Sequence, residues 1–192
     1  MAEPIVTPRL ALLPLRVEHA GEMAAVLADL DLYTFTGGAP PARQVLRARY
    51  ERLIAGSPDP AVSWCNWVIQ LSGPGGLAGT VQATISTAPE PVPGPAPEPV
   101  PGAVAAHEPP VSRHRGPVAE VAWVVGTPWQ GQGIATEAVR ALVAWFAQQS
   151  VRTVIAHIHP RHQASAAVAA AAGLAPTGQW HDGEIRWRRT MP

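Results

Sequence analysis

A glycine-bearing turn at residues 124–137 joins an apolar segment to an amphipathic one, and its residue types suit phosphate binding. Gly131 and Gly133 carry no side chain, so the backbone can approach an anion closely. The unpaired amides of a following helix, at the positive end of its dipole, would point at that anion. The absence of lysine excludes a P-loop, and the three glycines of the dinucleotide fingerprint are not present. The bare pattern favours a structural turn over a ligand site.

A single carboxylate interrupts the apolar segment that precedes this turn. Glu120 lies among Val118, Val121 and Ala122, where burial would raise its pKa toward neutrality. Such a group could take a proton from an ammonium, directly or through water. The alternative is a carboxylate at the exposed start of a strand, paired with an arginine such as Arg115. The residues alone favour neither interpretation.

Three histidines later in the chain raise the question of a metal site. His157 and His159 alternate on one predicted strand and therefore share a face, and His162 follows them closely. No carboxylate accompanies them in the sequence, so we predict no metal site.

The composition excludes several classes of partner. The chain has 192 residues and a formal net charge of +0, with 14 basic residues, all arginine, against 14 acidic ones. Without a net charge there is no long-range field to attract nucleic acid or anionic lipid, so we expect neither partner. The single cysteine, Cys65, excludes an internal disulfide, and neither a signal peptide nor a membrane span is indicated. We expect a soluble cytoplasmic protein.

The elements that must position these residues follow from hydrophobic periodicity and from turn residues. The expected elements are an edge strand over 9–15, helices over 18–30 and 42–55, strands over 64–71, 77–85 and 118–125, a helix over 133–149, a strand over 153–159, a helix over 163–172, and strands over 174–180 and 184–189. The nearly continuous apolar run at 118–125 predicts a strand covered on both faces. This order predicts a mixed α/β or α+β domain rather than a doubly wound one.

A proline-rich segment separates the two halves of this pattern. Residues 88–117 contain ten prolines, which remove amide donors and favour extended polyproline II over helix or interior strand. Because the flanking sequences look like halves of one fold, we predict a loop insertion within a single domain over 1–192. A ligand for a proline-recognition module is the less frequent alternative.

The sequence of the turn resembles a motif of a known family. Gln130-Gly-Gln-Gly-Ile-Ala135 resembles the pyrophosphate loop, Gln/Arg-x-x-Gly-x-Gly/Ala, of the GNAT superfamily of acyl-CoA-dependent N-acetyltransferases. Residues 7–15, 120–125, 133–138 and 165–174 resemble segments of its ribosomal-protein-alanine N-acetyltransferase branch. The resemblance covers nearly the whole chain except the insertion. It implies a GNAT-like α+β fold, whose mixed, mostly antiparallel sheet has about six to seven strands flanked by about four helices.

The resemblance implies acetyl-CoA as co-substrate and no metal. In the family, central-strand backbone groups pair with the pantetheine arm, and amides of the next loop hold the pyrophosphate. The matching positions here are Val124, Val125, Gln130, Gly131, Gln132, Gly133, Ile134, Ala135 and Thr136. His162 stands where the family usually has asparagine, and its imidazole could still donate a hydrogen bond to the pantetheine.

The resemblance also implies roles in catalysis. It favours Glu120 as the general base, and Ser165 matches a serine near the cofactor sulfur that could donate to the departing thiolate. A small packing residue is the alternative for Ser165. Many relatives use a late tyrosine as this acid, but only Tyr33 and Tyr50 are present, both far upstream. Tyr33 and Phe35 lie in the loop that shapes the acceptor site in this branch.

The sequence therefore predicts an N-acetyltransferase in which an amine attacks the thioester directly in a ternary complex. The acceptor would be a protein N-terminus or a small-molecule amine, and homodimers are common among relatives. The alternative is a catalytically degenerate module that binds acyl-CoA and presents the proline-rich loop to a partner.

Overall fold

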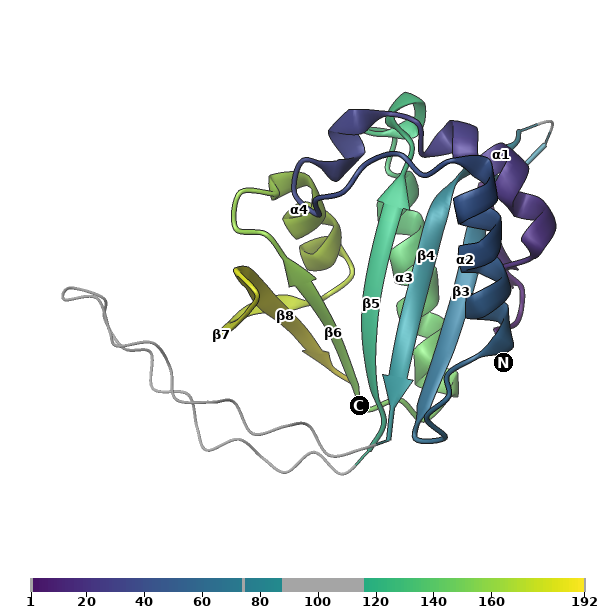
Figure 1. The fold of residues 1–192 in the computed structure, drawn as a ribbon. Coiled ribbons are helices and arrows are strands. Elements are labelled where there is room, and N and C mark those ends of the chain that lie inside the picture. The colour runs from purple at the N-terminus through teal and green to yellow at the C-terminus, as the bar shows by residue number, and fades with distance from the viewer. Residues whose placement is uncertain (1, 74, 88–115, 192) are drawn as a thin grey trace.

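An eight-stranded sheet organises residues 2–73, 75–87 and 116–191, which are the residues that the computed structural model describes (Figure 1). Its strand order is β1-β2-β3-β4-β5-β6-β8-β7, and only β5 and β6 pair in parallel. The strands are β1 (Ile5–Val6), β2 (Leu10–Pro14), β3 (Val62–Leu71), β4 (Leu77–Ser86), β5 (Val118–Val125), β6 (Thr153–Ile158), β7 (Ala175–His181) and β8 (Glu184–Thr190). The predicted α+β class, with its mostly antiparallel sheet, is confirmed.

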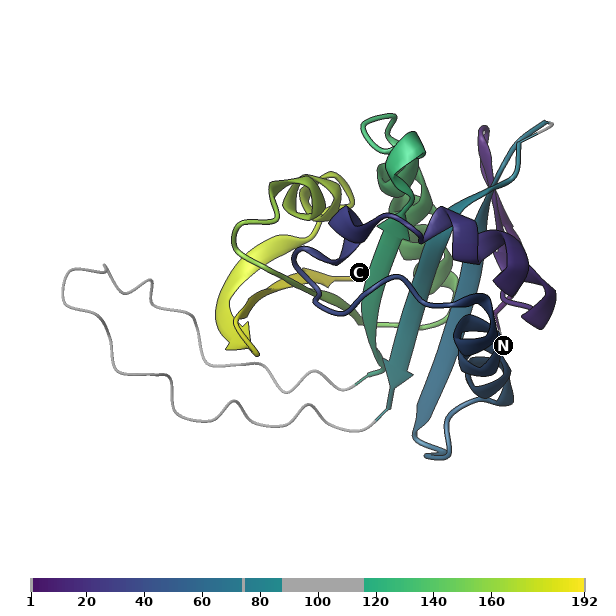
Figure 2. The ribbon, with the colours of Figure 1, turned by 45° about the horizontal axis from the view of Figure 1, so that its top comes forward.

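Four α-helices cover the sheet, as predicted, and three short 3₁₀ turns join the elements. The helices are α1 (Ala20–Val26), α2 (Arg43–Ala55), α3 (Ile134–Gln148) and α4 (Gln163–Ala171); the turns are η1 (Val17–His19), η2 (Leu30–Tyr33) and η3 (Thr127–Trp129). α1 and α2 lie over β3 and β4 on one face, whereas α3 lies on the opposite face and packs against α4 (Figures 1 and 2). The sheet is thus the middle layer of three.

Two apolar clusters hold these layers together. The larger one lies under α3, where Ala138, Leu142 and Phe146 are fully buried at a spacing of four residues. The smaller one lies under α1 and α2 and includes Met23, with 0% exposure, and Leu46, with 1%. In β3 the larger cluster takes Trp67 and Ile69 and the smaller one takes Val68, so both faces of this part of the strand are buried.

Three expectations about the sheet need correction. The sheet has eight strands rather than six to seven, because the two-residue strand β1 is too short to show alternation. β1 pairs with β2, so β2 is not the edge strand that its flanking prolines suggested. β5 is buried on one face only, because Glu120 and Ala122 are exposed on the other. The helix expected over 18–30 is shorter, since η1 and η2 take its ends.

The strands on either side of the proline-rich segment are neighbours in the sheet. Ser86 at the end of β4 pairs with Val118 at the start of β5. The predicted extended conformation concerns residues that lie outside the described part, apart from Gly116 and Pro117. No helix in the described ranges is long and apolar enough to span a bilayer.

Candidate active site

The central strand β5 has two very different neighbours. β4 pairs with it along its whole length, from Val118 to Val125. β6 pairs in parallel only as far as Glu120 with Ile155, and beyond that point the two strands diverge (Figure 1). The divergence leaves one edge of residues 121–125 without a partner strand, and backbone N–H and C=O groups on such an edge can pair with an added strand-like ligand.

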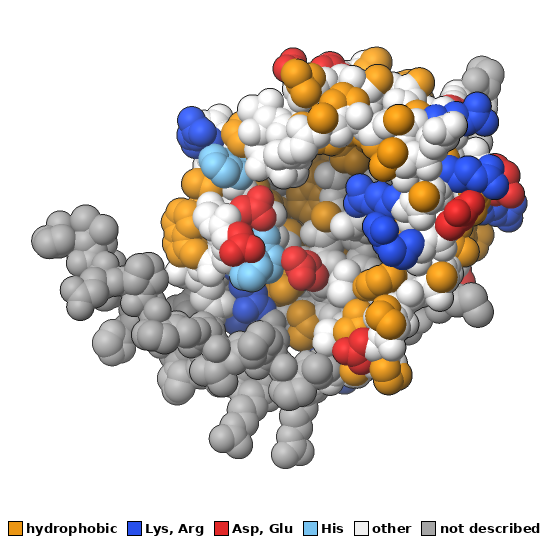
Figure 3. Space-filling view, viewed as in Figure 1, with side chains coloured by type: hydrophobic (Ala, Val, Ile, Leu, Met, Phe, Trp, Pro, Cys, Tyr) orange, Lys and Arg blue, Asp and Glu red, His pale blue; other side chains and the backbone are white. Residues whose placement is uncertain are grey.

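A cleft of about 1160 Å³ occupies this divergence, and the space-filling view shows it as a hollow near the centre of the face (Figure 3). Its lining comes from β5, β6, η2, α2, the glycine turn and the start of α4. Of the residues predicted for the site, only Glu120 and Gln132 do not line it. Those that do are Tyr33, Phe35, Val124, Val125, Gln130, Gly131, Gly133, Ile134, Ala135, Thr136, His162 and Ser165.

The glycine turn opens α3 directly at one end of the cleft. Gly131 and Gly133 have φ values of 72° and 77°, in the left-handed region that glycine adopts without strain. Gly133 is the N-cap of α3, and no heavy atom lies within 4 Å of the position that a Cβ on Gly131 would take. The first residues of α3, whose amides precede the first hydrogen bond within the helix, line the cleft, and this arrangement fits the pyrophosphate of coenzyme A.

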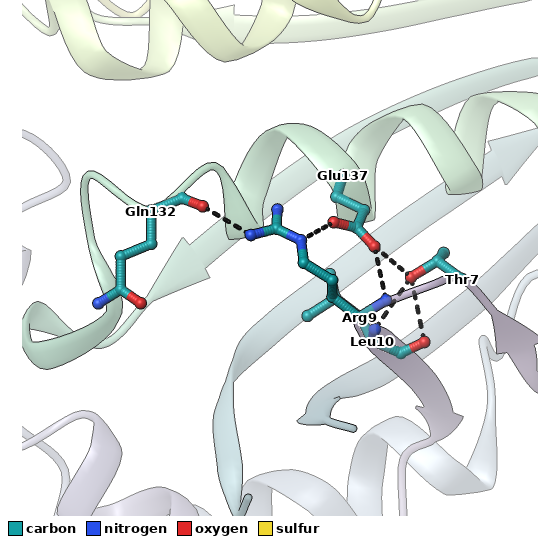
Figure 4. Close-up of polar contacts among 5 residues, drawn as sticks. All are labelled: Thr7, Arg9, Leu10, Gln132 and Glu137. Carbon is teal, nitrogen blue, oxygen red and sulfur yellow. Dashed lines mark hydrogen bonds and ion pairs between the residues drawn. The ribbon is translucent and has the colours of Figure 1, made fainter. Parts of the chain in front are cut away.

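Arg9 and Glu137 brace this turn from behind (Figure 4). The Glu137 carboxylate accepts hydrogen bonds from the Thr7 hydroxyl at 2.7 Å, the Arg9 amide at 3.1 Å and Arg9 Nε at 2.6 Å. Arg9 Nη1 also donates to the Gln132 carbonyl at 3.1 Å. Burial raises the pKa of Glu137, but the hydrogen bonds from Thr7 and Arg9 outweigh it, so that the pKa is lowered overall. The start of the chain is thus tied to the turn.

Glu120 occupies the exposed one of the two environments that the sequence left open. Its side chain is 51% exposed, because it lies on the open face of β5. Its partner is an imidazole instead of an arginine: Glu120 Oε1 lies 2.8 Å from His157 Nδ1. His157 is 14% exposed and lines the cleft. Arg115, the expected alternative partner, lies outside the described residues.

The start of α4 carries the other predicted residues. His162 is the N-cap of α4, and its Nδ1 accepts a long hydrogen bond of 3.5 Å from the Ser165 amide. The Phe35 ring stacks on the His162 ring with centroids 4.4 Å apart, which brings the η2 segment across to α4. Burial, followed by the neighbouring His159, lowers the pKa of His162, so the neutral ring that can accept this bond is favoured.

The three late histidines contact other side chains. Within the described residues, no group of three or more His, Cys, Asp or Glu side chains is placed to hold a metal ion. His157 instead pairs with Glu120 and packs against the His181 ring at 5.1 Å. His159 packs near Phe35 with centroids 5.2 Å apart.

Local sequence patterns do not identify two of the functional candidates. Arg9 lies in the segment 7–15 that resembles the family's opening strand, but no local pattern predicts its contact with the turn. His157 was considered only as a metal ligand, because residues 120 and 157 are far apart in sequence and meet only through the pairing of β5 with β6. Strand register, which periodicity does not supply, brings these two side chains together.

Comparison with known proteins defines the class. A family model described as an acetyltransferase (GNAT) domain matches residues 9–175. The chain therefore belongs to the GNAT acetyltransferase family and is an acyl-CoA-dependent acetyltransferase. None of the curated proteins matches its sequence significantly.

Solved structures show the same fold at low sequence identity. A GNAT-family acetyltransferase from Bacillus anthracis has a TM-score of 0.69 and 15% identity, with 98% of both chains covered. The RimL ribosomal L7/L12 alpha-N-protein acetyltransferase, in complex with coenzyme A, has a TM-score of 0.67 and 16% identity, with 98% of both chains covered. The microcin C7 self-immunity acetyltransferase MccE, in complex with acetyl-CoA and AMP, has a TM-score of 0.69 and 14% identity, with 96% of this chain and 94% of that chain covered.

Proposed function

We propose that the protein transfers an acetyl group from acetyl-CoA to a primary amine by direct attack in a ternary complex. The divergence of β5 and β6 carries the proposal, because it joins an unpaired strand edge, the glycine turn and an imidazole in one cleft. The volume of about 1160 Å³ exceeds the roughly 300–1,000 Å³ of a typical small-ligand pocket. Two reactants can therefore share it.

The donor side would be held mainly by backbone. Val124 and Val125 offer N–H and C=O groups to the pantetheine arm, and a strand amide near Val124 would polarise the thioester carbonyl. The amides of residues 130–136 would hold the pyrophosphate. The contacts of Arg9 and Glu137 already keep the turn in the conformation that this needs. His162 lines the cleft and would contact the pantetheine through Nε2, since Nδ1 accepts the Ser165 amide.

His157 would take the proton from the attacking amine, with Glu120 as its positioning residue. The predicted direct role of Glu120 is less favoured because its carboxylate does not line the cleft, whereas the imidazole that it holds does. A carboxylate on Nδ1–H keeps Nε2 as the acceptor. The amine nitrogen, once deprotonated, attacks the thioester carbon to give a tetrahedral intermediate. As its C–S bond breaks, the nitrogen loses its second proton, and Ser165 or water relays a proton to the thiolate and is restored by the one from nitrogen.

Two acceptor classes remain within this proposal, a protein N-terminus and a small-molecule amine. The first is the acceptor that the name of the RimL relative states, and MccE is named for self-immunity to microcin C7. A homodimer, predicted from the family resemblance, also remains a proposal.

Calorimetric titration with acetyl-CoA and with free CoA, followed by thiol release over amines and N-terminal peptides, tests the proposal. We expect acetyl-CoA to bind and the thiol of CoA to be released when an acceptor is present. Binding without release from any acceptor would favour a degenerate acyl-CoA-binding module, and no binding would reject both functions.

A matched pair of variants tests the role of His157. We expect His157→Gln to lower kcat/KM by about 10²- to 10⁴-fold, the usual contribution of a general base, with acetyl-CoA affinity retained. His159→Gln is the control, because His159 lines the same cleft without a carboxylate partner. A large loss in His159→Gln and none in His157→Gln would contradict the assignment.

A further inference from the structure

Charged side chains border the cleft on both sides, and their types differ between the sides. Carboxylates and imidazoles border the hollow on the side of β6 and β8, whereas arginines border it on the side of α2 (Figure 3). The charged side chains that line the cleft are Asp31, Arg49, Arg161 and Glu184. Among these, Arg49 is the one that α2 contributes, across the cleft from the proposed base His157.

Arg49 is a free cation in the described part of the chain. It forms no hydrogen bond or ion pair there, whereas Arg47, on the same helix, pairs with Glu51 at 3.1 Å and does not line the cleft. The helix therefore presents one arginine that is used within the fold and one that is available to a ligand. A guanidinium in this situation suits a carboxylate, which it can bind through two parallel hydrogen bonds.

A second unpaired donor lies beside Arg49. Tyr50 also lines the cleft, is 4% exposed, and its hydroxyl has no hydrogen-bond partner among the described residues. Burial raises the pKa of Tyr50 to about 12, and the nearby Arg49 guanidinium opposes this shift. The phenol thus stays protonated at neutral pH and remains a donor, which an acceptor oxygen could reach only after the side chains around the buried hydroxyl move.

We propose that the acceptor is a primary amine that carries a carboxylate, with its ammonium toward His157 and Glu184 and its carboxylate at Arg49. This inference rests on the proposed function and narrows its substrate class. Arg49 fits one carboxylate better than a dianionic phosphate, because Asp31 and Glu184 already balance the charges of Arg49 and Arg161 in the same cleft. The carboxylate could belong to a free amino acid or to an acidic side chain near a peptide N-terminus.

Paired acceptors with and without this carboxylate test the proposal. kcat/KM is measured by thiol release for phenylalanine against phenylalaninamide, and for Ala-Asp-amide against Ala-Asn-amide. We expect the carboxylate member of at least one pair to be preferred about tenfold, as for one charge-assisted contact, and that pair identifies the source of the carboxylate. Arg49→Gln should lower the ratio by about the same tenfold factor, while Arg47→Gln should leave it unchanged.

A binding experiment separates this proposal from the proposed function. The CoA-bound protein is titrated with N-acetylphenylalanine and its amide, and with N-acetyl-Ala-Asp-amide and its asparagine counterpart. Tighter binding of a carboxylate member, lost in Arg49→Gln, supports the substrate class even if no thiol is released. Equal affinities and equal kcat/KM within both pairs, or a preference that survives Arg49→Gln, would overturn it.

Discussion

The donor and acceptor sides of the cleft are built in different ways. The donor side consists of a strand edge and a glycine turn, and the turn is held by Arg9 and Glu137, which already have partners. The acceptor side consists of side chains, several of which, such as Arg49, have no partner in the described residues. A side that relies on backbone depends on local conformation, whereas a side that relies on side chains depends on their chemistry. Substitutions on the acceptor side should therefore lower turnover, whereas substitutions on the donor side should weaken acetyl-CoA binding.

The largest effect should come from the acceptor side. Glu120→Gln removes the charge that holds His157, and we expect turnover to fall about 10²-fold, a loss typical of a positioning carboxylate, with acetyl-CoA affinity unchanged. The measurement is kcat by thiol release beside calorimetry. Asp182→Asn is the control, because Asp182 approaches His181 at 3.5 Å in an exposed pair that does not line the cleft. Unchanged turnover in Glu120→Gln would remove Glu120 from the mechanism.

The next effect should be confined to the donor side. Gly133→Val places a β-branched residue at a φ of 77° and brings its Cβ to 3.4 Å from Arg9 Nη2. Left-handed backbone strain costs about 1–3 kcal/mol, so we expect acetyl-CoA binding to weaken about tenfold to hundredfold. Calorimetry measures the change. Gly178→Val, at a position with open space and ordinary φ, should bind normally, and intact affinity in Gly133→Val would contradict the turn's assignment.

A smaller effect is expected for the contacts of Glu137 with Thr7 and Arg9, which support the turn. Glu137→Gln replaces charge-assisted hydrogen bonds from Thr7 and Arg9, and we expect a loss of about 1–2 kcal/mol in the free energy of unfolding at pH 7. Because the folded pKa of Glu137 is lowered, this contribution is present above the unfolded value near 4.3 and is lost as the pH falls through the folded pKa.

Denaturant unfolding from pH 7 to pH 3 checks this pH dependence. The stability curves of wild type and Glu137→Gln should converge below about pH 4. Glu51→Gln is the control, since the exposed Glu51–Arg47 pair should contribute less than about 0.5 kcal/mol. If the difference in unfolding free energy between wild type and Glu137→Gln stayed constant with pH, the carboxylate charge would not be what stabilises these contacts.

The smallest effect concerns His162, the N-cap of α4. The pKa of His162 is lowered from 6.5, so its contribution to stability is present above pH 6.5 and is lost as the pH falls through the folded value. Protonation would also place a positive charge at the N-terminus of α4. His162→Asn keeps a good N-cap that does not titrate, so the melting temperature of the variant should depend less on pH between 8 and 5. An equal pH dependence of the melting temperature in wild type and His162→Asn would contradict this role.

The sequence predicted the donor side more fully than the acceptor side. Glycines, an amphipathic helix and an apolar strand leave local signals, and the expected strand over 118–125 coincides with β5. The acceptor side depends on contacts such as the stacking of Phe35 on His162, between residues far apart in the chain. The sequence left both a buried and an exposed Glu120 open, and the exposed one holds, because a continuous apolar run does not reveal that a neighbouring strand diverges.

The amino-acid sequence by itself determined the order of the elements, the glycine turn at the start of α3 and the family resemblance, because these depend on local residue preferences. Only the tertiary structure decided that β6 leaves β5 after Glu120, that His157 meets Glu120 and that Arg9 supports the turn. Each of these follows from strand register and from the packing of distant segments. Residue types within one segment do not encode such contacts, since the partners come from other parts of the chain.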